Sequence, residues 1–358
     1  MTINHNNFLK LAFNIAKLNL GKTNSNPSVG CVVVKNNSVI SIGKTSFKGR
    51  PHAEFNALNK HINFKDSTLY TTLEPCTHFG VTPPCTNIII KKKIKRVYYA
   101  FNDVDTRTAN KANKVLIKYK IKVKKKAINK FKDFYQSYLI NKKKLMPLID
   151  AKLAISKDYY SINKRGKWIT NNFSRKRAHL IRSEYDLIIS TSKSINKDNS
   201  LLNCRLSGLD NNKPDLAIID LKLKLKKNLN LIKKRGKRKI FIVTLKKNDK
   251  KTLFFRNKGI KIIYSEPLNN RSKLNKLYSK FKKIGYNRIL IEAGLIFLRD
   301  MIEKKIVSNL FLFKSNVKLD KNGLNNTSNI FLKKIKLSNR ISVNLFGEKL
   351  FKIKVNNV

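Results

Sequence analysis

The sequence predicts an α/β protein of two domains, in which helices cover both faces of a sheet. Short apolar strands alternate with helical patterns along the chain, and this alternation is typical of such layered folds. The chain has 358 residues, and a chain of that length usually forms about two domains. A lysine run before Met146-Pro147 interrupts both periodicities. We therefore expect one domain over residues 1–146 and a second over residues 147–358.

The first domain is expected to begin with a helix, because apolar residues recur at helical spacing from Phe8 to Leu18. A Lys-Asn-Asn-Ser turn between two apolar runs then indicates a hairpin, and Pro83-Pro84 suits the first turn of a later helix. The elements expected after the first helix are strands at 29–34 and 39–42, a helix from about residue 52, a strand at 69–72, a helix after Pro83-Pro84, a strand at 97–100, a helix over 109–119 and a closing strand at 121–123.

The second domain is expected to show the same alternation of strands and helices and to end in strands. Strands are expected at 148–154, 187–190, 216–220, 240–244, 260–264 and 288–292, and helices at 174–183, 273–284 and 295–304. The tail has further strand-like runs at 310–313, 341–345 and 350–355. This strand-rich tail suggests an antiparallel finish to the sheet.

The composition limits the classes of function. The formal net charge is +57, which invites a nucleic-acid partner. Lysine is spread over the whole length beside asparagine and isoleucine, and no interleaved aromatic residues mark a stacking platform. We therefore favour compositional drift over a selected polyanion surface and do not expect a nucleic-acid partner. The charge would still attract anionic, phosphorylated substrates.

The sequence indicates neither a membrane segment nor a disulfide framework. No apolar run approaches the roughly 20 residues of a membrane span, and the N-terminus does not resemble a secretory signal. Four cysteines in a chain of this length are no disulfide framework. Cys31 lies in an apolar run and is expected to be buried, while Cys204 is assigned no role. We expect a cytoplasmic protein without a membrane partner.

A split motif carries the chemistry of the first domain. Pro51-His52-Ala53-Glu54 is followed by Glu74-Pro75-Cys76 and then by Cys85. One imidazole and two thiolates suit Zn²⁺ and leave its fourth tetrahedral position for water. Glu54 can stand beside that water as a general acid and base without binding the metal. The alternatives are a structural zinc site with His78 as the fourth ligand, or a core histidine with two unrelated cysteines.

The motif resembles the signature of zinc-dependent nucleoside and nucleobase deaminases, H-x-E followed by P-C…C. Eight residues separate the two cysteines, and this long insert resembles the deaminase half of the bifunctional riboflavin-biosynthesis enzymes. That resemblance implies a cytidine-deaminase-like α/β/α fold that binds one zinc ion. The run from Asn26 to Cys31 also resembles that family, which implies that Asn26 and His78 meet the substrate. The family usually has Lys or Arg where Val81 stands, at a position expected to meet the substrate phosphate.

The second domain resembles the reductase half of the same enzymes, which has a dihydrofolate-reductase-like α/β fold and uses NADPH. Residue chemistry alone assigns nothing catalytic in this half. The stretches that carry the resemblance are Lys152 to Asp158, Trp168-Ile169-Thr170, His179 to Ser183, the run containing Ser194, Asp198, Leu202 and Arg205, and Ile291 to Gly294.

That resemblance implies a substrate site and a cofactor site in the second domain. Arg182 and Arg205 would clamp the substrate phosphate, since guanidinium forks suit phosphate geometry. The substrate pocket would be lined by Gly166, Leu202 and Glu292. NADPH would be held by Ala154, Trp168, Ser194, Asp198 and the helix start formed by Gly294, Leu295, Ile296, Phe297, Leu298, Arg299 and Asp300, because a helix N-terminus suits a cofactor phosphate. Taken singly, these residues are more simply structural: Trp168 as a core anchor, Arg182 on a solvated face or in a salt bridge, and Glu292 as a helix cap. Their joint order along the chain favours the functional roles instead.

We therefore expect a bifunctional enzyme of riboflavin biosynthesis. It would use zinc to deaminate 2,5-diamino-6-(5-phosphoribosylamino)pyrimidin-4-one to 5-amino-6-(5-phosphoribosylamino)uracil. It would then use NADPH to reduce the ribosyl group to ribityl. Two alternatives remain: a deaminase with an inactive reductase-like domain, and a basic nucleic-acid-binding protein with a vestigial deaminase fold. A homo-oligomer is compatible with the family.

Overall fold

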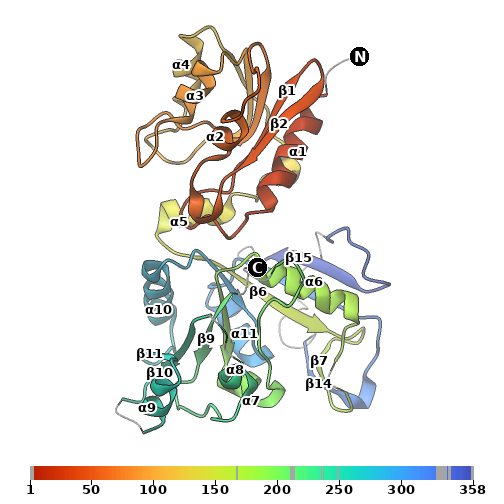
Figure 1. Ribbon diagram of the computed structural model, residues 1–358. Helices are drawn as coiled ribbons and strands as arrows, with labels where there is room; N and C mark the ends of the chain where they lie inside the picture. Colours follow the sequence, from red (N-terminus) through yellow and green to blue (C-terminus); the bar gives the residue numbers. More distant parts are fainter. Residues whose placement is uncertain are drawn as a thin grey trace. The chain divides into compact units, whose positions relative to one another are not determined.

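The computed structural model describes residues 4–166, 168–209, 214–234, 236, 238–247, 250–327, 337 and 340–355. The chain divides into two compact units, Met1–Leu145 and Met146–Val358, and Figure 1 shows a sheet with helices in each. No helix of the described ranges combines the length and the apolar character that crossing a bilayer requires.

The first unit contains a five-stranded sheet in the order β2-β1-β3-β4-β5. β1 is antiparallel to both β2 and β3, whereas β3, β4 and β5 run parallel. The elements are α1 (His5–Lys17), β1 (Gly30–Lys35), β2 (Ser38–Lys44), η1 (Phe47–Gly49), α2 (Ala53–Leu58), β3 (Thr68–Leu73), α3 (Cys85–Lys91), β4 (Arg96–Phe101), α4 (Ala112–Ile117), β5 (Lys122–Lys125), η2 (Asn129–Phe131) and α5 (Gln136–Lys144).

The helices α1 and α2 cover opposite faces of this sheet. Cys31, the residue after Gly30, pairs with Gly43 of β2, so Gly30 and Gly43 point to opposite faces. A Cβ atom on Gly30 would come within 1.9 Å of the Ala12 carbonyl oxygen in α1, and one on Gly43 within 2.2 Å of the Ala53 carbonyl oxygen in α2. The two glycines therefore let a helix backbone approach each face closely, as the layered fold requires.

The second unit contains an eight-stranded sheet in the order β11-β10-β9-β8-β12-β6-β13-β15. Its strands are parallel except β15, which is antiparallel to β13. The elements are β6 (Leu148–Ile155), β7 (Tyr160–Asn163), α6 (Asn172–Arg182), β8 (Leu187–Thr191), α7 (Ser192–Asp198), β9 (Asp215–Ile219), α8 (Asn230–Lys233), β10 (Ile240–Thr244), α9 (Lys250–Asn257), β11 (Lys261–Tyr264), α10 (Arg271–Ile284), β12 (Arg288–Ile291), α11 (Leu295–Glu303), β13 (Asn309–Lys314), η3 (Asp320–Asn322), β14 (Gly323–Asn326) and β15 (Lys349–Lys354).

Alternate residues of this sheet face two separate hydrophobic cores. Ile189 of β8 belongs to a cluster that includes buried residues of α10 and α11, such as Leu298. Its neighbour Ile188 belongs to a second cluster, with Ile181 of α6 and further residues of α7, α8 and α9. Because consecutive strand residues point to opposite faces, α10 and α11 cover one face and α6 to α9 cover the other.

Most of the expected elements are confirmed, and their ends differ by only a few residues. The first hairpin, the parallel strands of both sheets and the antiparallel finish formed by β15 against β13 are all present. Cys31 is fully buried, as expected. α7 was not predicted, because its sequence Ser192–Asp198 is almost entirely polar. Its start is nevertheless visible as a side-chain cap, since Thr191 accepts a hydrogen bond from the Ser194 N–H.

The strand expected at 341–345 is wrong. Only one isolated bridge, between Arg340 and Phe351, pairs this region with β15. The carbonyl oxygen of Leu345 instead accepts a hydrogen bond from Asn171 Nδ2 at 2.8 Å, and Glu348 Oε1 accepts one from the Asn171 N–H at 2.9 Å. The segment therefore caps the start of α6, and this contact replaces a continuous strand ladder.

We expect Gly30→Ala to destabilise the first unit, because its methyl group would have to displace the backbone of α1. Overpacking of this kind costs roughly 1–3 kcal/mol. Amide hydrogen exchange of β1 and β2 peptides in increasing denaturant is the measurement, and protection should be lost at a lower denaturant concentration. Ser38→Ala, at an exposed position of the same hairpin, is the control and should leave protection unchanged. Wild-type protection in Gly30→Ala would contradict the close approach of α1.

Candidate active sites

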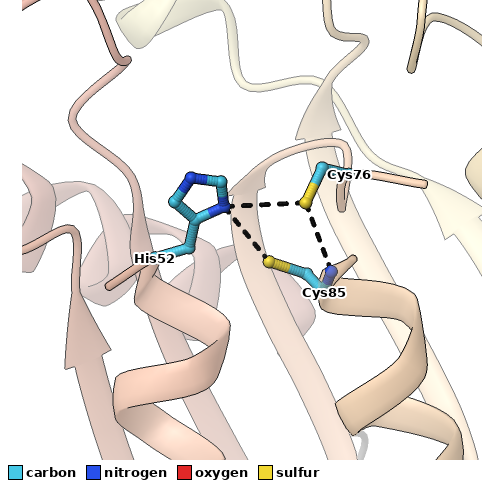
Figure 2. A group of neighbouring side chains, drawn as sticks. All are labelled: His52, Cys76 and Cys85. Carbon is cyan, nitrogen blue, oxygen red and sulfur yellow. Dashed lines mark hydrogen bonds between the residues drawn. The ribbon is translucent and has the colours of Figure 1, made fainter. Parts of the chain in front are cut away.

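Three metal-binding side chains from separate segments converge in the first unit (Figure 2). His52 directly precedes α2, Cys76 follows β3, and Cys85 is the first residue of α3. One ligand atom from each lies within 4.8 Å of the other two. His52 Nδ1 is 3.6 Å from Cys76 Sγ and 3.4 Å from Cys85 Sγ. The structure thus brings the three ligands expected from the sequence to one centre.

The local backbone explains this convergence. His52 occupies the extended N-cap position of α2, and Pro84 occupies the same position before α3. Figure 2 shows both helices starting at the cluster, and the two helices pack against each other. Cys85 also donates its backbone N–H to Cys76 Sγ at 3.2 Å. Helix starts therefore present the histidine and one cysteine, and a backbone hydrogen bond fixes the other cysteine.

Glu54 lies beside the cluster without belonging to it. Its side chain is buried in the first turn of α2. Oε1 accepts a hydrogen bond from Thr71 Oγ1 at 3.3 Å, and Oε2 lies 3.5 Å from Cys85 Sγ. Burial raises the pKa of Glu54, because desolvation disfavours the charged carboxylate. The carboxyl group is therefore suited to accept and hold a proton.

The two cysteines differ in their proton affinity. The hydrogen bond from Cys85 lowers the pKa of Cys76, and the neighbouring His52 acts in the same direction. The hydrogen bond with Cys76 and burial raise the pKa of Cys85 well above its usual value. Of the two, Cys76 therefore more readily becomes a thiolate, which is the form of cysteine that binds metal ions.

The donor set fits a catalytic zinc site. One nitrogen and two sulfur ligands from the protein leave one tetrahedral position open. His78 is not part of the cluster, because its Nδ1 is hydrogen-bonded to Thr108 Oγ1 at 2.9 Å. Among the described residues, the structure thus offers no fourth protein ligand of the kind that a closed structural site would need. The donor chemistry and the uncoordinated Glu54 favour the catalytic alternative.

Asn26, expected to meet the substrate, is engaged with a neighbouring loop. Its Nδ2 donates to the Gly49 carbonyl oxygen at 2.9 Å. Gly49 has a φ of +94°, and a Cβ atom there would come within 2.8 Å of Asn26 Nδ2. Only glycine allows this approach readily. Asn26 therefore also fixes the segment that leads into Pro51-His52.

Charged side chains gather in the second unit, where the central strands end. Glu292 directly follows β12, Arg182 is the last residue of α6, and Lys152 lies in β6. Arg182 binds Glu292 through two hydrogen bonds, from Nε to Oε1 at 2.6 Å and from Nη2 to Oε2 at 2.9 Å. Lys152 Nζ lies 3.8 Å from the same carboxylate. This edge is where ligands bind in open parallel sheets.

The charges of this cluster shift one another's proton affinity. Burial alone would raise the pKa of Glu292, but Arg182 and Lys152 lower it to about 2. Burial lowers the pKa of His179 to about 4, and the charges of Arg182 and Arg205 contribute to that shift. At neutral pH the cluster therefore contains a charged carboxylate, at least one guanidinium beside it, and a neutral imidazole.

The two arginines expected to clamp the substrate phosphate differ in their exposure and in their hydrogen-bond partners. Arg182 is half-buried against Glu292 and also donates to the Asn203 carbonyl oxygen at 3.2 Å. Arg205 is exposed, and its Nη1 donates to Asn203 Oδ1 at 2.8 Å. Both approach His179, since Arg182 Nη1 lies 3.5 Å from His179 Nδ1 and the Arg205 backbone N–H donates to that nitrogen at 3.3 Å. Arg205 therefore has the more accessible guanidinium.

The other two residues of the expected substrate pocket hold special backbone positions. Leu202 is buried with a φ of +50°, and its carbonyl oxygen accepts a hydrogen bond from Arg238 Nη1 at 3.0 Å. Gly166 lies in an exposed loop, where a Cβ atom would come within 2.8 Å of Asn163 Nδ2. Neither residue offers a charged side chain to a ligand.

The residues expected to hold NADPH come from several strand ends. Ser194 in α7 accepts the Gly294 N–H at 3.0 Å, which joins the starts of α7 and α11. Ala154 is half-buried in β6, and Asp198 ends α7. Trp168 is 55% exposed, with the Arg175 guanidinium 4.8 Å from its ring centroid. An exposed tryptophan is not the core anchor that was weighed as its alternative role.

The start of α11 combines core side chains with exposed ones. Gly294 is its extended N-cap. Leu295 and Leu298 are buried in the core, whereas Ile296 is exposed and Phe297 is half-buried. Arg299 lies 3.6 Å from Glu303, and Asp300 pairs with Lys304. The backbone N–H groups of the first turn are therefore the groups that this helix offers to a bound phosphate.

Sequence reasoning did not assign a role to Lys152, although the structure places it in the charged cluster. A signal was available, because β6 carries Asp150 and Lys152 within an otherwise apolar strand. The two charges differ in role. Asp150 is fully buried and accepts hydrogen bonds from Tyr185 and Asn309, so it is structural. Lys152 faces Glu292 instead.

Comparison with protein-family models defines the class of each part. Residues 2–101 match the cytidine and deoxycytidylate deaminase zinc-binding region, and residues 147–315 match the RibD C-terminal domain. The fold and the two sites thus define an enzyme that joins a zinc-dependent deaminase to a dihydrofolate-reductase-like reductase.

Comparison with known proteins defines the family. The chain is 30% identical to the riboflavin biosynthesis protein RibD of Aquifex aeolicus over 317 residues, covering 86% of this chain and 85% of that one. It is 32% identical to RibD of Buchnera aphidicola over 330 residues, with 86% and 85% covered. The crystal structure of a diaminohydroxyphosphoribosylaminopyrimidine deaminase/5-amino-6-(5-phosphoribosylamino)uracil reductase from Thermotoga maritima matches with a TM-score of 0.82 at 25% identity, covering 98% of each chain. This chain belongs to the RibD family of bifunctional riboflavin-biosynthesis enzymes.

We expect Glu292→Gln to destabilise the second unit at neutral pH, because it leaves Arg182 buried without its counter-charge. Removing one partner of a buried ion pair costs about 3–5 kcal/mol. The pKa of Glu292 falls from its usual 4.5 to about 2 on folding. The advantage of wild type over the variant is therefore complete above about pH 4.5 and declines as the pH falls toward 2. Denaturant unfolding followed by Trp168 emission measures it, since this is the sole tryptophan.

The control for this prediction is Glu303→Gln. The Glu303 side chain is 61% exposed and its Arg299 partner is also at the surface, so the change should stay within roughly 0.5 kcal/mol at every pH. A Glu292→Gln difference that does not vary with pH would show that the carboxylate charge contributes nothing.

Proposed function

We propose that residues 1–146 form the deaminase domain and residues 147–358 form the reductase domain. The first would convert 2,5-diamino-6-(5-phosphoribosylamino)pyrimidin-4-one to 5-amino-6-(5-phosphoribosylamino)uracil, and the second would reduce the ribosyl group of that product to ribityl. The observation that carries the proposal is a cluster of one imidazole and two cysteine sulfurs beside a buried carboxyl group outside it. That arrangement suits hydrolytic deamination, because it gives every group of the motif a role: the imidazole and the two sulfurs as metal ligands and the carboxyl group as the general acid and base.

In this proposal His52, Cys76 and Cys85 would hold a zinc ion, which would supply Lewis acidity that lowers the pKa of a bound water. Glu54 would accept one proton from the attacking water and pass it to the ring nitrogen. It would then transfer the second proton of that water to the departing amine as the ring carbonyl forms. Burial raises the pKa of Glu54, which suits a group that must both accept and return a proton. Thr71 holds one carboxyl oxygen in place. The products are ammonia and a ring carbonyl.

The substrate contacts of the deaminase follow from the same pocket. Asn26 and His78 lie on the two loops that flank the cluster, and each is fixed by a hydrogen bond, to Gly49 and to Thr108. We propose that both side chains meet the pyrimidine substrate. Their fixed orientation lowers the entropy lost on binding.

In the reductase domain the cofactor supplies the hydride, and the protein positions and polarises the substrate. We propose that Arg182 and Arg205 bind the substrate phosphate, and that Gly166, Leu202 and Glu292 line its pocket. Arg182 Nε and Nη2 already donate to Glu292. The exposed Arg205 would therefore be the first of the two arginines to contact the substrate phosphate. Charge-assisted hydrogen bonds from guanidinium to phosphate suit both arginines.

We propose that NADPH binds along the ends of β6, β8 and β12. Ala154, Trp168, Ser194 and Asp198 would contact it from the strand ends and from α7. The start of α11, from Gly294 to Asp300, would bind a cofactor phosphate through backbone N–H groups, since Leu295 and Leu298 point into the core.

The proposal extends to partners and location. We propose a cytoplasmic enzyme whose partner is the phosphorylated pyrimidine, with a homo-oligomer compatible with that role. Membership of both halves in enzyme families does not favour the nucleic-acid-binding alternative. The high net charge then acts only through a general attraction for phosphorylated ligands.

We expect Glu54→Gln to keep zinc and lose turnover. Glutamine has nearly the same shape but cannot take up a proton, and general acid–base catalysis contributes about 10²–10⁴-fold. Zinc content per chain and ammonia release from the diaminopyrimidine substrate are measured on the same samples. Cys85→Ser is the comparison variant and should lose zinc and activity together. Ammonia release at the wild-type rate by Glu54→Gln would remove Glu54 from the mechanism.

We expect the wild-type enzyme to oxidise NADPH when supplied with the deaminated substrate. Arg205→Gln should raise KM for that substrate by about 10- to 100-fold, because a charge-assisted hydrogen bond to phosphate is lost. The loss of absorbance at the nicotinamide band is the measurement. Arg256→Gln, in α9 and hydrogen-bonded to Tyr264, is the control and should keep the wild-type KM. The absence of NADPH oxidation by wild type would support the alternative of an inactive reductase-like domain.

A further inference from the structure

Arg50 lies at the edge of the metal-binding cluster and has no assigned role. It is half-buried and stands two residues before His52.

The guanidinium of Arg50 reaches the insert between the two cysteines. Nη1 donates to Thr82 Oγ1 at 2.7 Å. Nη2 lies 3.5 Å from the position that a Cβ atom on Gly80 would take, and His78 Nε2 lies 3.9 Å from the same position. The absence of a side chain at Gly80 therefore leaves a gap that the arginine and the histidine border together.

No carboxylate of the described residues lies within ion-pair distance of Arg50. The other arginine near this pocket is different, because Arg107 is paired with Asp105 at 2.6 Å, and Lys142 approaches the same carboxylate at 3.0 Å. Arg107 therefore already has its anionic partner. Arg50 keeps a full positive charge and several free N–H donors at the edge of the pocket.

Two hydrogen bonds restrain Arg50, one to the backbone before it and one from its guanidinium. Gly49, the preceding residue, accepts the hydrogen bond from Asn26 Nδ2, and Thr82 holds the guanidinium from the other side. The backbone before Arg50 is held by Asn26 and the guanidinium by Thr82, so the side chain loses less conformational entropy when it binds an anion. The structure therefore presents a preorganised cation next to the residues proposed to meet the pyrimidine.

We propose that Arg50 binds the phosphate of the deaminase substrate and makes the site selective for the phosphorylated form. This inference rests on the proposed deaminase function. It also accounts for a departure in this chain, because Val81, at the position where the family usually has a cation, is 86% exposed and cannot bind an anion. Arg50 approaches the same insert and supplies the charge from the opposite loop.

The test compares two substrates, the phosphorylated diaminopyrimidine and its dephosphorylated form, by steady-state ammonia release from the zinc-loaded full-length enzyme. Arg50→Gln should raise KM for the phosphorylated substrate by about 10- to 100-fold. KM for the dephosphorylated substrate, and kcat for both, should stay near wild type, because the lost interaction involves only the phosphate. Zinc content is measured for every variant.

Three further variants separate binding from structural effects. Lys48→Gln, an exposed lysine two residues away, removes the same charge and should change nothing. Thr82→Val removes the hydrogen bond to Arg50 but keeps its charge, so it should affect KM less than Arg50→Gln. Val81→Lys added to Arg50→Gln returns a cation to the insert and should recover part of the loss for the phosphorylated substrate.

Two outcomes would overturn the proposal for Arg50 alone. In the first, Arg50→Gln weakens both substrates equally, which would mean that the arginine only positions the insert. In the second, Arg50→Gln changes neither KM. If zinc-loaded wild type releases no ammonia from either substrate, the proposed deaminase function fails, and the role of Arg50 fails with it.

Discussion

The free energy cost of burying a carboxylate is the constraint on which both sites depend, and the two units meet it in opposite ways. In the second unit, Arg182 and Lys152 stand beside Glu292 and hold its pKa at about 2. In the first unit, no ion pair compensates Glu54 among the described side chains, and burial raises its pKa. One carboxylate is therefore a fixed charge that organises neighbouring cations, and the other has a raised pKa, which suits the proton transfer proposed for it. Electrostatic surroundings decide between these roles, because both residues are buried glutamates.

The layered folds place these carboxylates where ligands can reach them. In each unit the helices pack on both sides of a sheet, so the loops at the strand ends are the accessible part of the molecule. The metal-binding cluster forms where α2 and α3 begin beside the end of β3 (Figure 2). The charged cluster of the second unit forms where β12 ends between β6 and β8. Close approach of α1 and α2 to the first sheet depends on Gly30 and Gly43.

The three arginines proposed to bind substrate phosphates differ in how far neighbouring groups already engage their guanidinium groups. Arg205 is exposed, whereas Arg182 is already bonded to Glu292. Arg50 has no carboxylate partner among the described residues and is oriented by Thr82. A guanidinium that is not already paired with a protein carboxylate is the one best able to bind an anionic ligand. The +57 net charge does not identify these positions, since most lysines lie on solvated surfaces.

The sequence by itself determined the alternation of strands and helices and the ligand types of His52, Cys76 and Cys85, because these depend on periodicity and side-chain chemistry. It failed at 341–345, where hydrogen bonds to Asn171 replace a strand, and it missed the polar helix α7. It also gave no role to Lys152 or Arg50. Only the tertiary structure decided which charges are paired and which remain available, since pairing joins residues as distant as Arg182 and Glu292. Burial and distance set that outcome, and neither is a local property of the chain.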